Sequence, residues 1–229
     1  MNKSNHHRTV RSFVRRQGRV SDSRRSVLKT LWPKYGITVS DDFFDFAAIF
    51  GRIAPVVMEI GFGMGHALIE MAQQNPQINY MGVEVHKPGI AALLAELEEL
   101  NIQNVRVLEA DAQQILMHHI SDNSLAAILI YFPDPWPKKR HHKRRLIQHR
   151  FVNLLCTKLS AKGYIHFATD WQEYAEQALE IFTHTSELKN RSALGTYMER
   201  PRARPLTKFE KRGQQLGHQI YDLIFEKIV

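Results

Sequence analysis

The sequence predicts an α/β fold in which helices cover both faces of a mostly parallel, seven-stranded sheet. From residue 56 onward, short apolar runs alternate with longer stretches of helical periodicity. The apolar runs are continuous, which is typical of parallel strands buried on both faces. A glycine-rich turn follows the first run, Val56 to Ile60, at the place where such sheets bind ligands.

The segment before the sheet differs in composition. Residues 1–20 combine many cations with little apolar periodicity. A short helix is predicted over residues 21–31, capped by Ser21 or Ser23 and ending before Pro33. A second helix over residues 41–50 gathers several phenylalanines on one side. We therefore expect a basic, mobile N-terminal arm over residues 1–30 and a single domain over residues 31–229.

The rest of the chain alternates strand and helix. Residues 56–60 lead through the glycine turn into a helix over 65–74. The next strand, 80–85, precedes a helix over 87–100 whose leucines recur at helical spacing. Strand 104–108, helix 111–118, the apolar strand 125–132 and helix 143–159 continue the pattern. Strand 164–168 and helix 171–182 lead into two final strands, 188–192 and 219–228.

The bulk composition is that of an ordinary globular protein in a reducing compartment. Hydrophobic residues make up 44% and charged residues 24% of the chain. No apolar run approaches the roughly 20 residues of a membrane span. The single cysteine, Cys156, excludes an internal disulfide, and no apolar block follows the first residues. A cytoplasmic location and no membrane partner are expected; a monomer is favoured, and a homodimer stays open.

The net charge of +8 is concentrated in three segments, residues 1–30, 138–150 and 200–212. These segments hold 22 of the 31 Lys and Arg residues and only two acids. Because binding to a phosphate backbone depends on several cations acting together, this segregation favours a nucleic-acid partner. The alternative is that the segments are three solvated, mobile stretches.

The glycine turn carries an acid that bears on the ligand. Gly61, Gly63 and Gly65 allow a tight turn and a close approach of a ligand to the backbone. Their spacing is not that of a dinucleotide fingerprint, and Glu59 lies two residues before the first glycine. A carboxylate there opposes a pyrophosphate, whereas S-adenosylmethionine carries a sulfonium and an ammonium and no phosphate. The turn therefore indicates an S-adenosylmethionine site in a Rossmann-like class I methyltransferase fold.

Two more acids follow the next two strands. Glu84 ends the second strand, where a carboxylate can accept both ribose hydroxyls. Asp111 follows the third strand, near the expected adenine edge. The structural alternative for Asp111 is an N-cap of the following helix. Three successive strands that each deliver an acid to one rim favour a cofactor site.

A stiff loop and a basic run follow the fourth strand. Three prolines within residues 133–137 hold Asp134 and Trp136 at the rim where the donor methyl is expected. The alternative is a proline-pinned turn with a packed tryptophan. The basic run 138–145 then indicates a phosphate clamp. A metal is not expected, because the neighbouring histidines at 118–119 and 141–142 diverge and no Cys or acid completes a ligand set.

Over nearly its whole length the chain resembles the bacterial tRNA (guanine-N7)-methyltransferases, the TrmB family. The most specific matching motifs are Pro133-Asp134-Pro135-Trp136 with its basic tail and the late Thr207-Lys208-Phe209-Glu210. The resemblance extends to residues 11–19, 59–63, 82–86 and 168–170. It implies S-adenosylmethionine as cofactor, tRNA as partner, and methylation of a variable-loop guanine at N7.

The resemblance also implies roles for individual residues. The cofactor is bound by the turn and the rim acids: Glu59, Gly61, Gly63, Glu84, Asp111 and Asp134. Asp134 is in addition the expected catalytic residue. The substrate contacts are Lys138, Asp170, Thr207, Lys208, Phe209 and Glu210. The RNA contacts are Arg140, His141, His142, Lys143, Arg144 and Arg145, with Arg15, Arg16 and Arg19 of the arm as candidates for clasping the tRNA backbone.

Guanine N7 has an in-plane lone pair and no proton, so attack needs no general base, and catalysis depends on positioning and charge. We expect Asp134 to bridge donor and base while Asp170 and Glu210 hold the guanine edge. Two rival functions remain. One is a methyltransferase acting on another RNA or on a basic small molecule, and the other is an RNA-binding protein with a vestigial cofactor fold.

Overall fold

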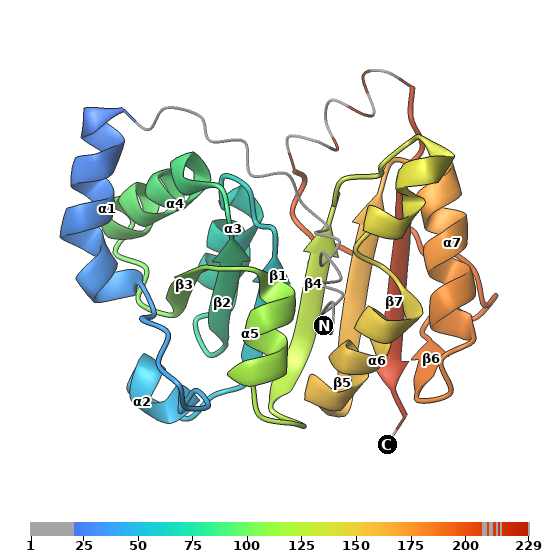
Figure 1. Cartoon of the computed structure of the whole chain (residues 1–229), viewed down its shortest axis with the longest axis horizontal. Coiled ribbons are helices and arrows are strands. Elements are labelled where there is room, and N and C mark those ends of the chain that lie inside the picture. The colour runs from blue at the N-terminus through green and yellow to red at the C-terminus, as the bar shows by residue number, and fades with distance from the viewer. Residues whose placement is uncertain (1–20, 208–209, 211–212, 214, 216, 229) are drawn as a thin grey trace, which may run out of the picture.

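The computed structural model describes residues 21–207, 210, 213, 215 and 217–228. Within this part, one seven-stranded sheet carries helices on both faces (Figure 1). The predicted mostly parallel α/β fold is confirmed. Five residues expected at the site lie outside the described residues, namely Arg15, Arg16, Arg19, Lys208 and Phe209.

The sheet has the strand order β3-β2-β1-β4-β5-β7-β6. Its strands are β1 (Val56–Ile60), β2 (Asn79–Glu84), β3 (Val105–Glu109), β4 (Leu125–Tyr131), β5 (Leu159–Thr169), β6 (Leu188–Asn190) and β7 (Tyr221–Lys227). The first five strands in the chain are parallel to one another, and β7 is antiparallel to both β5 and β6. The order of the strands reverses between β1 and β4, so ligands are expected to bind beside the carboxyl ends of these two strands.

The helices follow the strands in the predicted alternation. They are α1 (Asp22–Tyr35), α2 (Phe46–Phe50), α3 (His66–Gln74), α4 (Lys87–Glu99), α5 (Ala112–His118), the 3₁₀ helix η1 (Lys139–Arg144), α6 (His149–Lys158) and α7 (Gln172–Thr183). In the described part of the chain, none of them is long and apolar enough to cross a membrane.

The sheet separates two hydrophobic cores. Met58 and Ile60 of β1 point into the core formed with α5, α6 and α7. Val57, the residue before Met58, points into the core formed with α1, α3 and α4. Both faces of the strand are thus buried, because successive side chains point to opposite faces. This double burial explains why the strands are continuous apolar runs in the sequence.

Helix α1 is longer than predicted. It runs through Pro33 to Tyr35, whereas the sequence pattern placed its end before the proline. Proline removes one backbone donor and disfavours a helical residue before it. Packing overrides that local preference here, because Leu31 and Trp32 contact the second core and Tyr35 is fully buried. The expected boundary after residue 30 consequently lies inside α1, and residues 22–30 belong to a helix that packs on the domain.

Two other predicted helices are shorter than expected. The helix predicted over 41–50 is helical only as α2, with Asp45 as its N-cap. The helix predicted over 143–159 is divided into η1 and α6, with extended backbone at Arg145 and Gln148. The division follows from tertiary contacts, because Ile147 donates its backbone N–H to the hydroxyl of Tyr174 in α7, 3.0 Å away.

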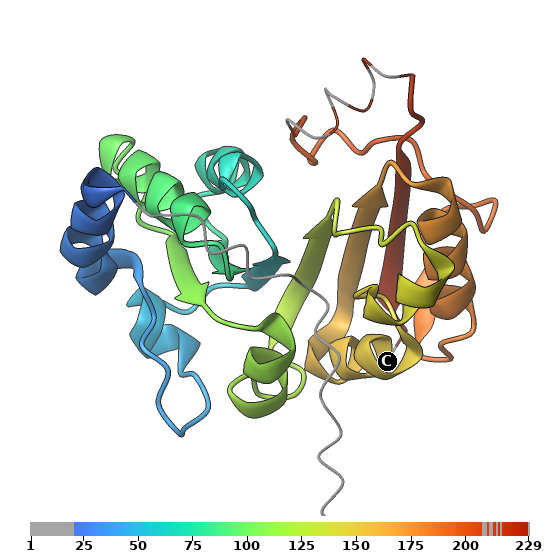
Figure 2. The same ribbon diagram turned by 45° about the horizontal axis from the view of Figure 1, so that its top comes forward.

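Helix α1 lies beside α4, as Figures 1 and 2 both show. The Tyr35 hydroxyl donates to Glu98 Oε2 at 2.7 Å. Lys34 Nζ donates to the same carboxylate oxygen at 2.5 Å. The first hydrogen bond involves a buried ring, so it is the better candidate for a measurable contribution to stability. Exposed ion pairs such as Lys34–Glu98 contribute little.

We predict that Tyr35→Phe lowers the free energy of unfolding by about 1 kcal/mol, since the ring still fills its site and one hydrogen bond is lost. Urea denaturation of the full chain measures this. The double variant Tyr35→Phe/Glu98→Gln should cost less than the sum of the single variants. A fully additive double variant would contradict the proposed α1–α4 contact.

Candidate active site

The candidate site lies at the carboxyl ends of β1, β2 and β4. The backbone turns sharply at Gly61, Gly63 and Gly65, whose φ angles of 74°, 59° and 83° lie in the left-handed region. A Cβ atom built on Gly61 or Gly63 would have no neighbour within 4 Å, so the turn faces open space. This open, side-chain-free backbone is what the close approach of a ligand requires.

A fourth glycine, Gly89 at the start of α4, supports the turn from behind. A Cβ atom at this position would lie 2.0 Å from the carbonyl oxygen of Gly63. No side chain can be accommodated there unless the turn moves. Gly89 was not among the residues expected at the site, because its role depends on how closely α4 packs against the turn.

Glu84 holds the turn through its carboxylate. Oε2 accepts the backbone N–H of Gly63 at 2.9 Å. Oε1 accepts the backbone N–H groups of Val85 and His86 at 2.6 and 3.0 Å. An ionised carboxylate that accepts several backbone donors forms strong hydrogen bonds. Glu84 therefore shapes the site, in addition to any contact with a ribose.

Glu59 is a buried carboxyl group with an unused oxygen. The residue is 3% exposed, and Oε2 has no hydrogen-bond partner in the described part of the chain. Burial, together with the negative charge of Glu84, raises the pKa of Glu59 to about 8. Leaving a polar group buried and unpaired is costly. A cationic ligand that binds at the turn would remove that cost, so this carboxyl group fits the ammonium of the expected cofactor.

Asp111 caps helix α5, which was the structural alternative. Its Oδ1 accepts the backbone N–H of Gln113 at 3.0 Å. The residue is only half-buried and stands at the end of β3, on the same edge as Glu84 at the end of β2. The N-cap role is therefore shown, and a contact with the adenine edge stays a proposal.

The loop after β4 is held in an unusual backbone conformation. Phe132 and Trp136 have φ angles of 51° and 46°, which non-glycine residues rarely adopt. The Phe132 N–H donates to the Ala168 carbonyl of β5 at 2.8 Å. Between these two points Asp134 is exposed, with no hydrogen bond or ion pair to the described residues. The loop thus presents a free carboxylate at the rim.

Arg145 has a different role from the one expected. It is 2% exposed and therefore lies out of reach of an RNA backbone. Its Nε donates to the Pro135 carbonyl at 2.8 Å, and its Nη1 donates to Gln177 Oε1 at 2.7 Å. Its guanidinium also lies over the ring of Tyr174, 5.0 Å from the centroid. Arg145 is an anchor that ties the proline loop to α7.

The rest of the basic run remains accessible. Lys138, Arg140 and Lys143 are exposed, and His141, His142 and Arg144 are half-buried. The Arg144 guanidinium lies over the Trp136 ring, 4.9 Å from the centroid, and the His141 ring meets the same indole edge-on. Burial and the surrounding cations lower the pKa of His141. The run and the loop therefore form one surface.

The expected substrate residues of the C-terminal half divide into two groups. Asp170 and Thr207 are half-buried, and Asp170 Oδ2 lies 3.4 Å from His218 Nδ1. Glu210 is 1% exposed and pairs with Arg204 through both carboxylate oxygens. Both carboxylate oxygens of Glu210 thus accept from Arg204, a pairing that no local sequence pattern reveals.

The histidine doublet at 118–119 has structural contacts. His119 Nδ1 lies 3.2 Å from the Asp42 carbonyl oxygen, and its ring stacks on Phe44. Among the described residues, no three His, Cys, Asp or Glu side chains come together in a metal-binding group.

Comparison with known proteins finds a matching family model and relatives about 50% identical to this chain. The family described as "Putative methyltransferase" matches residues 53–223. A protein of Nitrosospira multiformis named tRNA (guanine-N(7)-)-methyltransferase is 52% identical over 221 residues, which cover 96% of this chain and 96% of that protein. A protein of Idiomarina loihiensis with the same name is 50% identical over 96% of this chain and 89% of its own length.

Solved structures show the same fold at low identity. The 16S rRNA methyltransferase KamB superposes with a TM-score of 0.60 at 14% identity, over 84% of this chain and 97% of its own. A putative methyltransferase from Streptococcus mutans in complex with SAH gives 0.51 at 11% identity, over 76% and 88% of the two chains. The Rossmann-like class I methyltransferase fold is confirmed.

The raised pKa of Glu59 predicts a proton release on cofactor binding. Below pH 8 the free protein holds this group neutral, and a bound ammonium favours its ionised form. Affinity for S-adenosylhomocysteine should therefore rise with pH up to about 8, by at most about tenfold per unit. Calorimetry at pH 7 in two buffers of different ionisation heat measures the proton released.

Glu59→Gln is the matched control, because the amide keeps the shape and cannot ionise. It should bind more weakly and show no buffer-dependent heat from this group. Equal proton release by the variant and the natural sequence would show that another group is responsible.

Proposed function

Because the chain belongs to the tRNA (guanine-N(7)-)-methyltransferase family, we propose that it methylates N7 of a guanine in the variable loop of tRNA. The methyl donor is S-adenosylmethionine, and the products are 7-methylguanosine and S-adenosylhomocysteine. The observation that carries the proposal is identity near 50% over 96% of the chain to proteins of that name.

The cofactor would be held by the turn and the rim acids. The open backbone of Gly61 and Gly63 admits the ligand, and the orphaned oxygen of Glu59 pairs with its ammonium. Glu84 fixes the turn and accepts from the ribose, and Asp111 lies toward the adenine. S-adenosylmethionine supplies the methyl group as an electrophile on a sulfonium. The contribution of this chain is to place the base in line with it.

Asp134 is the proposed catalytic residue. Its carboxylate is exposed on a loop that Arg145 and the three prolines hold in place. Positive charge moves from the donor to the purine ring during transfer, and a carboxylate beside the base stabilises the charge that develops there. Asp134 also accepts hydrogen bonds from the N–H groups of the guanine edge. Asp170, Thr207 and Lys138 are further substrate contacts. Lys208 and Phe209 are kept in this set on the family resemblance alone.

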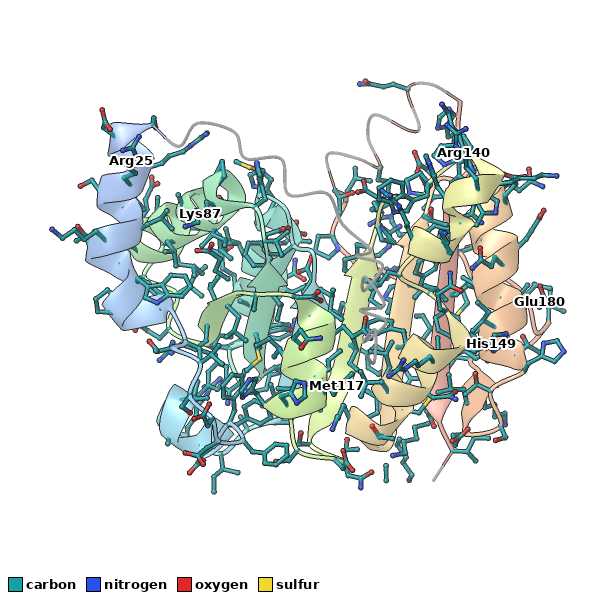
Figure 3. The ribbon with its side chains drawn as sticks, in the orientation of Figure 1. Arg25, Lys87, Met117, Arg140, His149 and Glu180 are labelled. Atoms are coloured by element: carbon teal, nitrogen blue, oxygen red, sulfur yellow. The ribbon has the colours of Figure 1, made fainter. Side chains whose placement is uncertain are left out.

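The RNA would lie across the edge of the molecule that carries the site. Arg25, Lys87 and Arg140 lie along this edge in Figure 3. The accessible cations Arg140, Lys143 and Arg144, with the histidines at 141–142, form the clamp nearest to Asp134. Arg15, Arg16 and Arg19 are proposed to clasp the backbone from the arm, taken as the residues before α1. We propose a cytoplasmic enzyme that acts as a monomer, because one chain carries every residue invoked.

The proposal is tested by incubating the protein with labelled S-adenosylmethionine and unmodified tRNA and locating the labelled nucleoside. The label is expected only in 7-methylguanosine from the variable loop. A tRNA whose variable-loop guanine is replaced by adenine is the control and should take up no label. Label in another nucleoside would favour a methyltransferase that acts on a different RNA position. RNA binding that does not depend on the cofactor, without any label, would favour an RNA-binding protein with a vestigial cofactor fold.

Asp134→Asn tests the charge argument. The amide preserves shape and some hydrogen bonding and removes the negative charge, so kcat should fall about 100-fold or more. Single-turnover kinetics with tRNA measures the fall, and tRNA binding should change little. Near-normal turnover in this variant would mean that the Asp134 charge has no part in transfer.

A further inference from the structure

A group of buried polar side chains adjoins the loop that bears Asp134 and the residues Thr207 and Glu210, which the family resemblance assigns to the substrate. Tyr131 ends β4, His166 lies in β5 and Asp222 lies in β7. Arg204 and Glu210 belong to the segment between β6 and β7 that carries the Thr207-to-Glu210 motif. All five are buried, with Arg204, Glu210 and Asp222 each 1% exposed. Burying ionisable groups is costly unless they are paired, so close contacts among these side chains are expected.

The hydrogen bonds among the three strand residues, Tyr131, His166 and Asp222, can be assigned a donor and an acceptor each. His166 Nε2 lies 2.7 Å from Asp222 Oδ1, and His166 Nδ1 lies 3.1 Å from the Tyr131 hydroxyl. Because a carboxylate only accepts, Nε2 carries the proton, and Nδ1 accepts from the Tyr131 hydroxyl. Burial lowers the pKa of His166, which keeps the ring neutral. Asp222 is thereby held in place at one of its two oxygens.

Arg204 joins this sheet-borne group to the motif. Its Nη2 donates to Asp222 Oδ2 at 2.9 Å and to Glu210 Oε1 at 3.1 Å. Its Nη1 donates to Glu210 Oε2 at 2.5 Å. Only the planar fork of an arginine can serve two carboxylates in this way. The Glu210 N–H in turn donates to Thr207 Oγ1 at 3.1 Å, so the two ends of the motif are linked.

The same guanidinium contacts the loop that bears Asp134. Its central carbon lies 5.7 Å from the Phe132 ring centroid and 5.9 Å from that of Tyr131. Phe132 has the left-handed backbone noted above and stands two residues before Asp134. A cation beside an aromatic ring is attracted to it, more strongly when both are desolvated. Arg204 therefore contacts both Glu210 and the loop that bears Asp134, and among the described residues it has no contact with the glycine turn.

We propose that Arg204 is a positioning residue that holds Glu210, and through it Thr207, in one fixed arrangement with the Asp134 loop, and so determines where the guanine lies. The inference rests on the proposed function. Glu210 then acts through Arg204 and does not contact the base itself. Asp222 and His166 complete the arrangement from the sheet.

Arg204→Lys keeps the charge and removes the fork. We expect kcat/KM for tRNA to fall about 10- to 100-fold, because a displacement of about 1 Å at the substrate has effects of this size. The dissociation constant of S-adenosylhomocysteine should stay within about twofold, since the turn is not displaced. Asp222→Asn, which removes the charge of the β7 carboxylate that pairs with Arg204, should shift the same parameters in the same direction.

Lys227→Met is the control for simple loss of stability. Lys227 is a buried cation, 8% exposed, at the opposite end of β7 from Asp222. Its Nζ donates to Asn123 Oδ1 at 2.7 Å. All kinetics are measured well below the melting temperature of each variant. Unchanged tRNA kinetics in Arg204→Lys would overturn the proposal. So would a matching fall in Lys227→Met, or a loss of cofactor binding in proportion to the loss of tRNA turnover.

Hydrogen–deuterium exchange separates this inference from the proposed function, since it needs no substrate. Arg204→Lys should speed the exchange of amides in residues 132–136 and 200–207 and leave residues 59–65 unchanged. If the natural protein does not methylate tRNA, the proposed function fails, and the exchange result still decides the role of Arg204. Unchanged exchange in both segments would overturn it.

Discussion

A parallel sheet buried on both faces is the constraint on which the rest of this structure depends. The strands β1 and β4 have apolar side chains on either side, packed against helices in two separate cores. Polar chemistry is therefore confined to the ends of the strands, and the reversal of strand order between β1 and β4 brings two ends together without a covering helix. The candidate site lies at these carboxyl ends, where polar groups can reach a ligand.

The site uses buried charge in two distinct ways. Glu59 is an acid whose unfavourable burial is left uncompensated, which makes it a partner for a cationic ligand. Arg145 and Arg204 are buried cations that donate hydrogen bonds to neighbouring acceptors, and each contacts part of the loop that carries Asp134. The unpaired group is suited to binding, and the paired groups are suited to rigidity.

The exposed carboxylate of Asp134 depends on both arginines. Arg145 fixes the loop on its far side through the Pro135 carbonyl, and Arg204 contacts Phe132 at its near side. The left-handed backbone at Phe132 and Trp136 persists because these contacts restrain it. A loop tied at two points can present one charged group with little loss of entropy when a substrate binds.

The sequence by itself determined the features that depend on neighbours along the chain. Continuous apolar runs predicted the parallel strands, the glycines predicted the turn after β1, and Glu59, Glu84 and Asp111 were predicted at the strand ends where they lie. Only the tertiary structure decided which members of a charged segment face solvent. Arg145 and Arg204 look like their basic neighbours in the sequence, and each has an acceptor on a separate element of the fold, Gln177 on α7 and Asp222 on β7. The same reason explains why α1 continues past Pro33, because the buried Tyr35 packs against α4, and no local pattern reveals that contact.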